Sequence, residues 1–430
     1  MRSAPIVQLH LHLLLDGKVL SWGHAGTPYV WDPAINVFTP EASPSLLFCA
    51  GHDFQADGKL FVAGGHVTDL HGLPNANLFD PATDTWTALP AMAWGRWYPT
   101  VTTLPNGEAL VLGGTDEQAA DVTIPEIWNG SSWRQLTTAV MKMPYYPRMF
   151  VAPDGRVFYA GEGQQSMYLD VTGTGQWSVG PTRVYGTRDY GSAVMYEPGK
   201  ILYVGGGDPP TKTAEIIDLN QPNPQWHATA SMTWPRRQMN ATILPTGEVL
   251  ATGGTESSGF NDPTGGIRTA ELWNPATGTW SWMASNQVTR IYHGATLLLP
   301  DGRLLHTGSG DASGAVNEKN YEIFSPPYLF KGPRPTITDS VPSVAGYGDT
   351  TVVLTPDAAS IAKVTFIRFG SVTHAFNHSQ RLVPLTFSQV TGGLKVTFPA
   401  TSIIAPPGPY LLFLVSNTGV PSEGKIVLLH

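Results

Sequence analysis

The stretch TRIYHGATLLLPDGRLLHTGSG, residues 289–310, is the part of the chain that indicates its fold. It has the pattern of a β-hairpin, in which apolar and small residues lead through a Pro-Asp-Gly turn into a second strand that ends on glycine. Tyr292 and His293 stand at its head, where an ordinary strand would carry valine or isoleucine. The same hairpin recurs upstream, and each copy places a different residue at the equivalent point. We therefore expect a repeat protein.

Seven turn-and-strand segments align on a glycine that follows the second strand. Their spacings are 41, 49, 48, 44, 48 and 55 residues, and the glycines are Gly23, Gly64, Gly113, Gly161, Gly205, Gly253 and Gly308. A period of about 40–50 residues with four strands per unit is typical of a β-propeller, and glycine doublets indicate the kelch type. Residues 1–332 are therefore predicted to form seven blades. The last unit has three clear strands, and we expect Ser3–Val7 to supply the fourth beside Tyr321–Ser325.

The repeat ends at a proline-rich segment, and residues 333–430 are predicted to form an immunoglobulin-like β-sandwich. Short alternating strands are expected at Thr351–Leu354, Lys363–Phe369, Leu394–Phe398 and Tyr410–Ser416. Within this region Ser371–Arg381 is too polar for an ordinary strand. The predicted fold class is therefore all-β, a seven-bladed kelch-type propeller followed by a sandwich.

Composition excludes several classes of protein. Among 430 residues, 46 are glycine and 37 proline while 13% are charged, which favours turns and packed strands over helices. A net charge of −8 argues against a nucleic-acid partner, and no apolar run approaches the roughly 18 residues of a membrane span. The single Cys49 cannot form an internal disulfide. We expect a monomer, secreted or periplasmic, whose leader is absent from this chain.

Counting fifteen residues back from each anchor glycine selects one residue per blade, and we expect these seven residues to lie on the innermost strands and ring one end of the central channel. None is aliphatic; they are Gln8, Cys49, Tyr98, Tyr146, Tyr190, Gln238 and His293. This indicates a polar, reactive floor, although a wide water-filled channel would also carry polar side chains. Cys49 and Tyr98 come from adjacent blades, so they are expected to touch, unless Cys49 is simply a small buried side chain.

Four segments resemble the galactose oxidase and glyoxal oxidase family, the copper radical oxidases. They are LLFCAG around Cys49, GRWYPT around Tyr98, TRIYHGATLLLPDGR around Tyr292 and His293, and VTHAFNHSQRLVPLTF around His374. The resemblance covers nearly the whole chain. It does not include the N-terminal sugar-binding domain that galactose oxidase itself carries. It implies one copper ion held by Tyr98, Tyr292, His293 and His374, a donor set that suits Cu(II). It also implies a Cys49–Tyr98 thioether that carries a radical, with Tyr292 as general base.

One position departs from the family pattern. In galactose oxidase a tryptophan after the third blade's glycine doublet covers the cross-linked tyrosine, whereas Gly113-Gly114 is followed here by Thr115-Asp116. Trp97, beside Tyr98, or Trp94 is expected to take that role, unless both only pack between blades. We therefore expect oxidation of small aldehydes or simple primary alcohols by dioxygen, with release of hydrogen peroxide, in preference to galactose.

Further side chains are expected to contact the substrate. Tyr146, Tyr190 and Gln238 belong to the floor, and five arginines lie beside it and would favour an anionic or hydroxyl-rich substrate: Arg96, Arg188, Arg236, Arg237 and Arg290. Their alternative role is to tie blades together. The competing functions are a non-catalytic kelch binding module and galactose oxidase proper.

Overall fold

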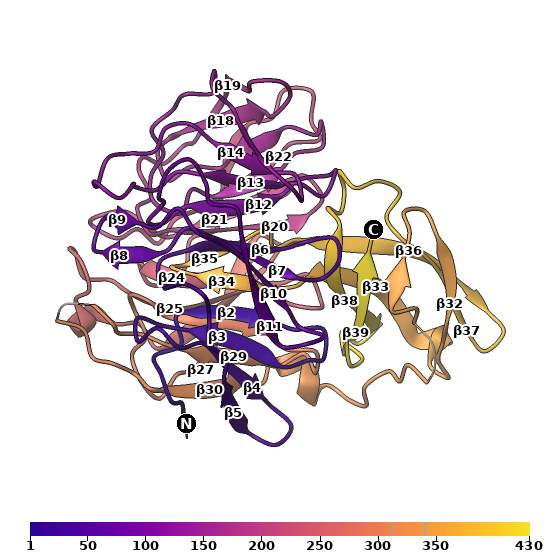
Figure 1. The fold of residues 1–430 in the computed structure, drawn as a ribbon. Coiled ribbons are helices and arrows are strands. Elements are labelled where there is room, and N and C mark those ends of the chain that lie inside the picture. Colours follow the sequence, from indigo (N-terminus) through magenta and orange to yellow (C-terminus); the bar gives the residue numbers. More distant parts are fainter. Residues whose placement is uncertain (313, 339–340) are drawn as a thin grey trace.

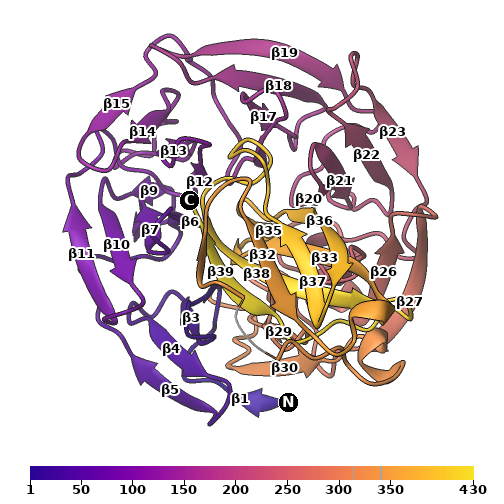
Figure 2. The same cartoon turned by 90° about the vertical axis from the view of Figure 1, so that its right-hand side faces the viewer.

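The computed structural model describes residues 1–312, 314–338 and 341–430. Seven four-stranded antiparallel blades surround a central axis, one of them extended to a six-stranded sheet by two strands from the C-terminal domain, and the C-terminal sheet lies over one face of the ring (Figures 1 and 2). The fold is a seven-bladed β-propeller with a curled β-sandwich domain, which confirms the predicted fold class. Within the described residues no helix is long and apolar enough to cross a membrane.

Each blade runs outward from the channel in strand order. Blade 1 is β2 (His10–Leu13), β3 (Val19–Trp22), β4 (Tyr29–Asp32) and β5 (Val37–Pro40); blade 2 is β6 (Gly51–Phe54), β7 (Leu60–Ala63), β10 (Ala76–Asp80) and β11 (Thr85–Leu89), with a small hairpin of β8 (His66–Thr68) and β9 (His71–Gly72). Blade 3 is β12 (Thr100–Thr103), β13 (Ala109–Leu112), β14 (Glu126–Trp128) and β15 (Trp133–Gln135); blade 4 is β16 (Met149–Val151), β17 (Val157–Tyr159), β18 (Gln165–Asp170) and β19 (Gln176–Thr182). Blade 5 is β20 (Ser192–Glu197), β21 (Lys200–Val204), β22 (Ala214–Asp218) and β23 (Trp226–Thr229); blade 6 is β24 (Arg237–Ile243), β25 (Val249–Thr255), β26 (Thr269–Asn274) and β27 (Thr279–Ser285), with the short 3₁₀ helix η1 (Pro263–Gly265).

The N-terminus closes the ring, as predicted. Blade 7 contains β28 (Ala295–Leu298), β29 (Leu304–Thr307) and β30 (Asn320–Phe324), and its outer strand is β1 (Arg2–Ser3). Arg2 pairs with Tyr321 and Ser3 with Asn320. The closing strand is therefore shorter and begins earlier than the expected Ser3–Val7, because the chain turns inward after Ala4 to reach the first strand of blade 1. Pairing the outer edge of blade 7 in this way couples both ends of the propeller.

A buried arginine–glutamate pair braces each of four blades from within. Arg236, which precedes the innermost strand of blade 6, pairs with Glu271 on the third strand at 2.8 Å and donates to the anchor carbonyl of Gly253 at 3.1 Å. Three further blades repeat the arrangement with Arg96–Glu126, Arg188–Glu215 and Arg290–Glu322. These arginines are fully buried. Four of the five arginines that were expected at the mouth are therefore structural, and they tie strands within a blade.

The C-terminal sheet has the strand order β31-β39-β38-β33-β36-β37-β32. The strands are β31 (Val344–Ala345), β32 (Thr350–Leu354), β33 (Ile361–Arg368), β36 (Leu382–Val390), β37 (Gly393–Thr397), β38 (Gly408–Ser416) and β39 (Lys425–Leu429); the 3₁₀ helices are η2 (Pro327–Phe330) and η3 (Ala358–Ser360). Its inner side packs into a separate apolar core, in which the Phe366 and Tyr410 rings stack with centroids 4.3 Å apart. All four expected strands are present, with ends shifted by one or two residues.

The polar segment of this domain enters the propeller. It forms β34 (Ser371–Thr373) and β35 (Phe376–Asn377), and β34 pairs with β2 of blade 1 through Leu11–Val372 and His12–Ser371. In Figure 1 this hairpin lies among the innermost strands, away from the rest of its domain. The segment is polar because it lines a channel that carries histidines and hydroxyls instead of packing into an apolar core.

Candidate metal centre and active site

The seven register residues line the channel in a shared backbone conformation. Six of them have positive φ, between 47° for Tyr146 and 65° for His293, and Gln8 is the exception. This left-handed geometry is uncommon for residues other than glycine. Because this conformation is not that of an extended strand, most of these residues lie just before the innermost strand of their blade, and only Gln238 lies within one. The expectation that all seven lie on strands was wrong in that detail.

Main-chain hydrogen bonds join these turns across blades. Tyr98 N donates to Cys49 O at 2.9 Å, Tyr146 N donates to Tyr98 O at 2.9 Å, and Gln238 N donates to Tyr190 O at 3.0 Å. The left-handed turn thus points each amide at the preceding blade, and the side chains are held at one level of the channel.

Two phenols and two imidazoles converge at this level. The Tyr98 and Tyr292 hydroxyls are hydrogen bonded to each other, and His374 Nε2 lies 2.8 Å from the Tyr98 hydroxyl. The His293 and His374 rings meet edge to face with centroids 4.4 Å apart, and His293 stacks on Tyr292 at 3.8 Å. All four side chains are buried, with at most 5% exposed. The structure therefore brings together the four residues predicted as ligands, from blades 3 and 7 and from the inserted hairpin.

His293 presents an unused nitrogen to this cluster. Its Nδ1 lies 2.6 Å from Gly310 O, so it donates a proton there and Nε2 keeps its lone pair. That buried Nε2 has no partner among the described residues. Burial lowers the pKa of His293 to about 3, so the ring is neutral. A neutral imidazole with an orphaned lone pair beside two phenol oxygens fits a bound transition metal.

Burial also raises the pKa values of the Tyr98 and Tyr292 hydroxyls well above their ordinary range, and the neighbouring thiol and phenols add to this effect. The two phenols are therefore protonated in the metal-free protein, and a divalent cation would favour their ionised forms. Among the described residues no three His, Cys, Asp or Glu side chains are grouped so as to hold a metal ion. Any metal here depends on the two tyrosines.

Tyr98 is enclosed by sulfur on one side and by indole on another. The Cys49 thiol is fully buried and packs in one cluster with Trp97 and Tyr98. Trp97 stacks on Tyr98 with ring centroids 3.7 Å apart and an angle of 6° between the planes. The Trp97 Nε1–H donates to His66 Nδ1 at 3.1 Å, which fixes the indole in the stacked orientation. Trp97 thus takes the position over the tyrosine that Thr115 and Asp116 leave without an aromatic ring.

Histidines and serine hold the inserted hairpin in the channel. Ser371 Oγ lies 2.7 Å from His52 Nδ1 and 3.1 Å from His12 Nδ1, and His52 Nε2 lies 2.9 Å from His10 Nδ1. His378, four residues beyond His374 on the same segment, packs against His52 with ring centroids 4.8 Å apart. The sequence offered only the density of histidines near β2 as a signal for this cluster.

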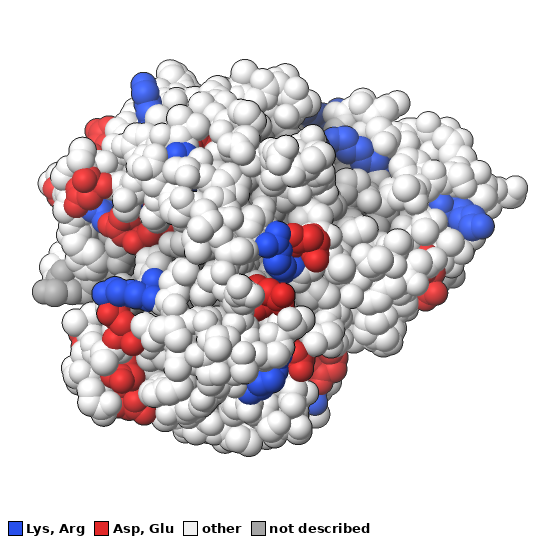
Figure 3. All heavy atoms as spheres, turned by 90° about the horizontal axis from the view of Figure 1, so that it is seen from above, with Lys and Arg blue, Asp and Glu red and all other residues white. Residues whose placement is uncertain are grey.

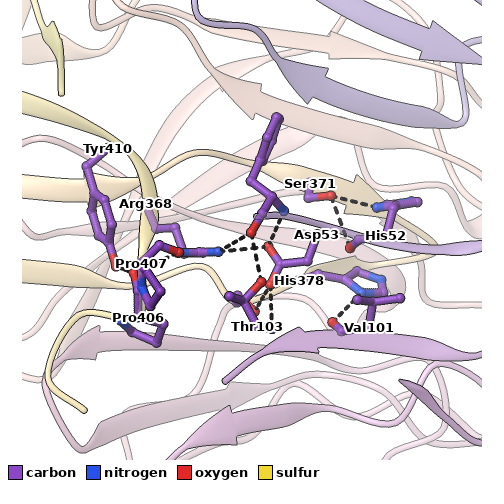
Figure 4. Close-up of polar contacts among 12 residues, drawn as sticks. His52, Asp53, Val101, Thr103, Arg368, Ser371, His378, Pro406, Pro407 and Tyr410 are labelled. Atoms are coloured by element: carbon purple, nitrogen blue, oxygen red, sulfur yellow. Dashed lines mark hydrogen bonds and ion pairs between the residues drawn. The ribbon is translucent and has the colours of Figure 1, made fainter. Parts of the chain in front are cut away.

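An ion pair anchors the base of the hairpin. The fully buried Asp53 lies 3.4 Å from Arg368, accepts from Ser379 Oγ at 2.6 Å and from Thr103 N at 2.9 Å (Figure 4). Arg368 donates in turn to Phe54 O at 2.7 Å and to the carbonyls of Pro406 and Pro407, each at 2.9 Å (Figure 4). This network connects blade 2 to the C-terminal sheet and to the segment just after His374.

The residues expected to contact substrate differ in whether they line the cavity and in whether their polar groups are already hydrogen bonded. Tyr190 lines a cavity of about 50 Å³ beside Tyr98 and His374, whereas Tyr146, also in its wall, donates its hydroxyl to Ala50 O at 3.1 Å. Gln238 is buried, and its amide has no partner among the described residues. The Tyr146 hydroxyl is therefore committed to the main chain, and its ring packs against His374 at 4.7 Å.

The two arginines predicted to bind substrate are both engaged elsewhere. Arg188 is one of the four buried braces and pairs with Glu215 at 2.7 Å. Arg237 pairs with Asp189 and, at 2.9 Å, with Asp208. The geometry therefore contradicts the expected anion-binding role, because both guanidinium groups already face carboxylates. The cavity wall instead contains Glu162, Asp189 and Arg148, which sequence reasoning missed because they lie outside the repeating register.

Comparisons with known proteins find similarity to several oxidases. Residues 334–429 match the family model "Galactose oxidase-like, Early set domain". A galactose oxidase of Gibberella zeae is 28% identical over 96% of this chain and 67% of its own length. The aldehyde oxidase GLOX of Vitis pseudoreticulata is 29% identical over 89% of this chain and 82% of its own length.

A solved structure shares the whole fold. A fungal alcohol oxidase of the AA5 family, in complex with copper, superposes with a TM-score of 0.91 at 24% identity and covers 99% of this chain and 98% of its own. The fold and the inserted hairpin define a propeller protein with a galactose-oxidase-like C-terminal domain. The chain is similar over most of its length to galactose oxidase and aldehyde oxidase sequences, which confirms the resemblance carried by the four motifs.

Proposed function

We propose that the chain is a copper radical oxidase that converts a small primary alcohol, or the hydrate of an aldehyde, into an aldehyde or acid. The balanced reaction is RCH2OH + O2 → RCHO + H2O2. The observation that carries the proposal is the convergence of two phenols, a neutral imidazole with an unused Nε2 and a second imidazole around one point, beside a buried thiol. A propeller that only binds a partner has no physical reason to bury the His293 Nε2 without a hydrogen-bond partner beside these phenols.

Tyr98, Tyr292, His293 and His374 would hold the copper, which when bound supplies a Lewis acid and a one-electron oxidant. We propose that Cys49 Sγ bonds to the Tyr98 ring. The S–H and a ring C–H bond are lost, a C–S bond forms, and the two hydrogens with their electrons pass to dioxygen.

The chain's own groups then divide the proton and hydrogen transfers. The Tyr292 oxygen accepts the proton of the substrate hydroxyl, for which its position beside the Tyr98 hydroxyl suits it. Once oxidised by one electron to a phenoxyl radical, Tyr98 would accept the hydrogen atom from the substrate carbon, and the stacked Trp97 shields its ring from water. The cavity of about 50 Å³ favours small substrates, because one water molecule already needs roughly 10–15 Å³ of such space. We therefore expect glyoxal-sized aldehydes and short alcohols to be better substrates than galactose.

The test measures mass and peroxide together. The purified protein is loaded with copper in air, and peptide mapping is expected to find segments containing Cys49 and Tyr98 joined with the loss of two hydrogens. Peroxide release is then measured with short alcohols, aldehydes and galactose. Tyr98→Phe and Cys49→Ser are both expected to abolish or greatly reduce it, Tyr98→Phe more severely. A free Cys49 thiol after loading would refute the radical oxidase, and faster turnover of galactose would refute the small-substrate assignment.

A further inference from the structure

Glu162 places a carboxylate in the wall of the active-site cavity, beside Tyr98 and His374. It lies between β17 and β18, and its main chain is fixed on both sides. Glu162 N lies 3.2 Å from the Tyr159 hydroxyl, and Glu162 O accepts from Arg188 N at 2.9 Å and from the Arg183 guanidinium. Its position is thus set by the braces of the propeller.

The carboxylate itself makes no ion pair or hydrogen bond among the described residues, unlike the other acid of the cavity. Asp189 pairs with Arg237, which also pairs with Asp208 at 2.9 Å. Glu162 therefore has acceptor capacity to spare at the point where a substrate enters.

The cations near Glu162 are already occupied. Arg148 donates to Gly191 O at 2.8 and 3.2 Å and also to Tyr146 O. Arg183 donates to Ala160 O at 2.9 Å and to two neighbouring carbonyls. The cavity thus offers a hydrogen-bond acceptor to its ligand, and its guanidinium donors are turned to the main chain.

The charged groups that face Glu162 are Asp189, Arg148, Arg183 and Arg237. Desolvation, reinforced by Asp189, raises the pKa of Glu162 to about 7 in spite of the three arginines. The side chain is therefore partly ionised at neutral pH, and an ionised carboxylate in this cavity rejects other anions. On the face drawn in Figure 3, basic and acidic side chains are interspersed and neither sign forms a large patch.

We propose that Glu162 determines substrate specificity by accepting a hydrogen bond from a second donor group, a hydroxyl or an ammonium, on a short alcohol. The favoured class is therefore small diols and amino alcohols, and hydroxy acids are disfavoured. This inference rests on the proposed oxidase function. Charge-assisted hydrogen bonds and sites built around them discriminate against a substrate that lacks the donor. We expect kcat/KM to be roughly 10- to 100-fold higher for a short alcohol that carries this second donor than for one of similar size that lacks it.

The test compares four substrates of similar size in the copper-loaded enzyme: ethane-1,2-diol, 2-aminoethanol, propan-1-ol and glycolate. Glu162→Leu is expected to lower kcat/KM for the diol and the amino alcohol roughly 10- to 100-fold and to leave propan-1-ol nearly unchanged. Glu162→Gln keeps a hydrogen-bond acceptor, so kcat/KM for the diol is expected to stay near its wild-type value. The preference of the wild type for the amino alcohol above about pH 7 is expected to be lost, and kcat/KM for glycolate is expected to rise. Glu197→Gln, at a surface pair with Lys200, is the control.

A second measurement does not depend on turnover. Calorimetric titration of the metal-free wild-type and Glu162→Leu proteins with ethane-1,2-diol and propan-1-ol is expected to show weaker diol binding in the variant only. Equal losses for both alcohols, in turnover or in binding, would overturn the role of Glu162. Absence of peroxide with every substrate in the wild type would overturn the oxidase function, and the titration would still decide whether Glu162 binds the donor.

Discussion

Replacing Asp53 by asparagine is expected to lower the free energy of unfolding by roughly 3–5 kcal/mol. Asp53 and Arg368 are both fully buried and 3.4 Å apart, so the variant leaves a guanidinium charge without its counter-ion. The asparagine also keeps one carbonyl oxygen where the carboxylate accepts from Ser379 Oγ and Thr103 N. Arg368 retains three main-chain acceptors, which is why the loss stays within the range for one broken buried pair.

The same loss can be expressed as a melting temperature. An unfolding entropy of about 2.1 cal/mol/K per residue gives about 0.9 kcal/mol/K if the 430 residues unfold as one unit. The Tm of the metal-free protein should therefore fall by about 3–6 °C. Differential scanning calorimetry measures it directly, and guanidinium titration checks the free energy.

The control is Asp121→Asn, which removes an exposed ion pair with Lys142 and should leave Tm unchanged within error. A fall of less than about 1 °C for Asp53→Asn would refute the argument, because it would mean that the pair is not a net stabilising contact between blade 2 and the C-terminal sheet. A fall as large in the control would show that the assay reports surface charge.

Three further outcomes are expected. Arg236→Met breaks the buried pair with Glu271 and should lower the free energy of unfolding by roughly 3–5 kcal/mol in urea titrations. Arg156→Met, at an exposed pair, should cost at most about 1 kcal/mol. Similar values for both variants would contradict the stabilising role of the buried pair. Trp97→Leu should preserve the fold by circular dichroism and shorten the lifetime of the Tyr98 radical absorption after oxidation, and an unchanged lifetime would show that the stack does not protect it. The Glu162 pKa is raised on folding from 4.5 to about 7, so its own contribution to stability falls as pH rises between these values, whereas the buried His293, whose pKa is lowered to about 3, contributes in the opposite sense. Glu162→Gln should therefore gain stability relative to the wild type as pH rises from 4.5 to 7, and a stability difference that does not change with pH in urea titrations would contradict this.

The repeat alone determined the number of blades, because each blade is built by local turns whose glycines recur in the chain. The same register predicted the level of the channel and six of its functional candidates, since equivalent positions in a propeller share one layer. The motifs around Tyr292 and His374 predicted the other two proposed ligands, although nothing local says that a sandwich domain sends a hairpin into the propeller. That placement comes from pairing between β34 and β2, which are more than 350 residues apart in the chain.

Tertiary structure alone decided what each polar group faces. Arg188 and Arg237 had the same local appearance, yet one became a brace and the other a partner of two aspartates. Glu162 had no sequence signal, because its role depends on a cavity walled by several blades and the inserted hairpin. Contacts between blades depend on how distant segments pack, and the hydrogen-bonding needs of buried side chains are met only there. Periodicity therefore predicts where residues lie in the propeller, and packing determines which of them remain available to a ligand.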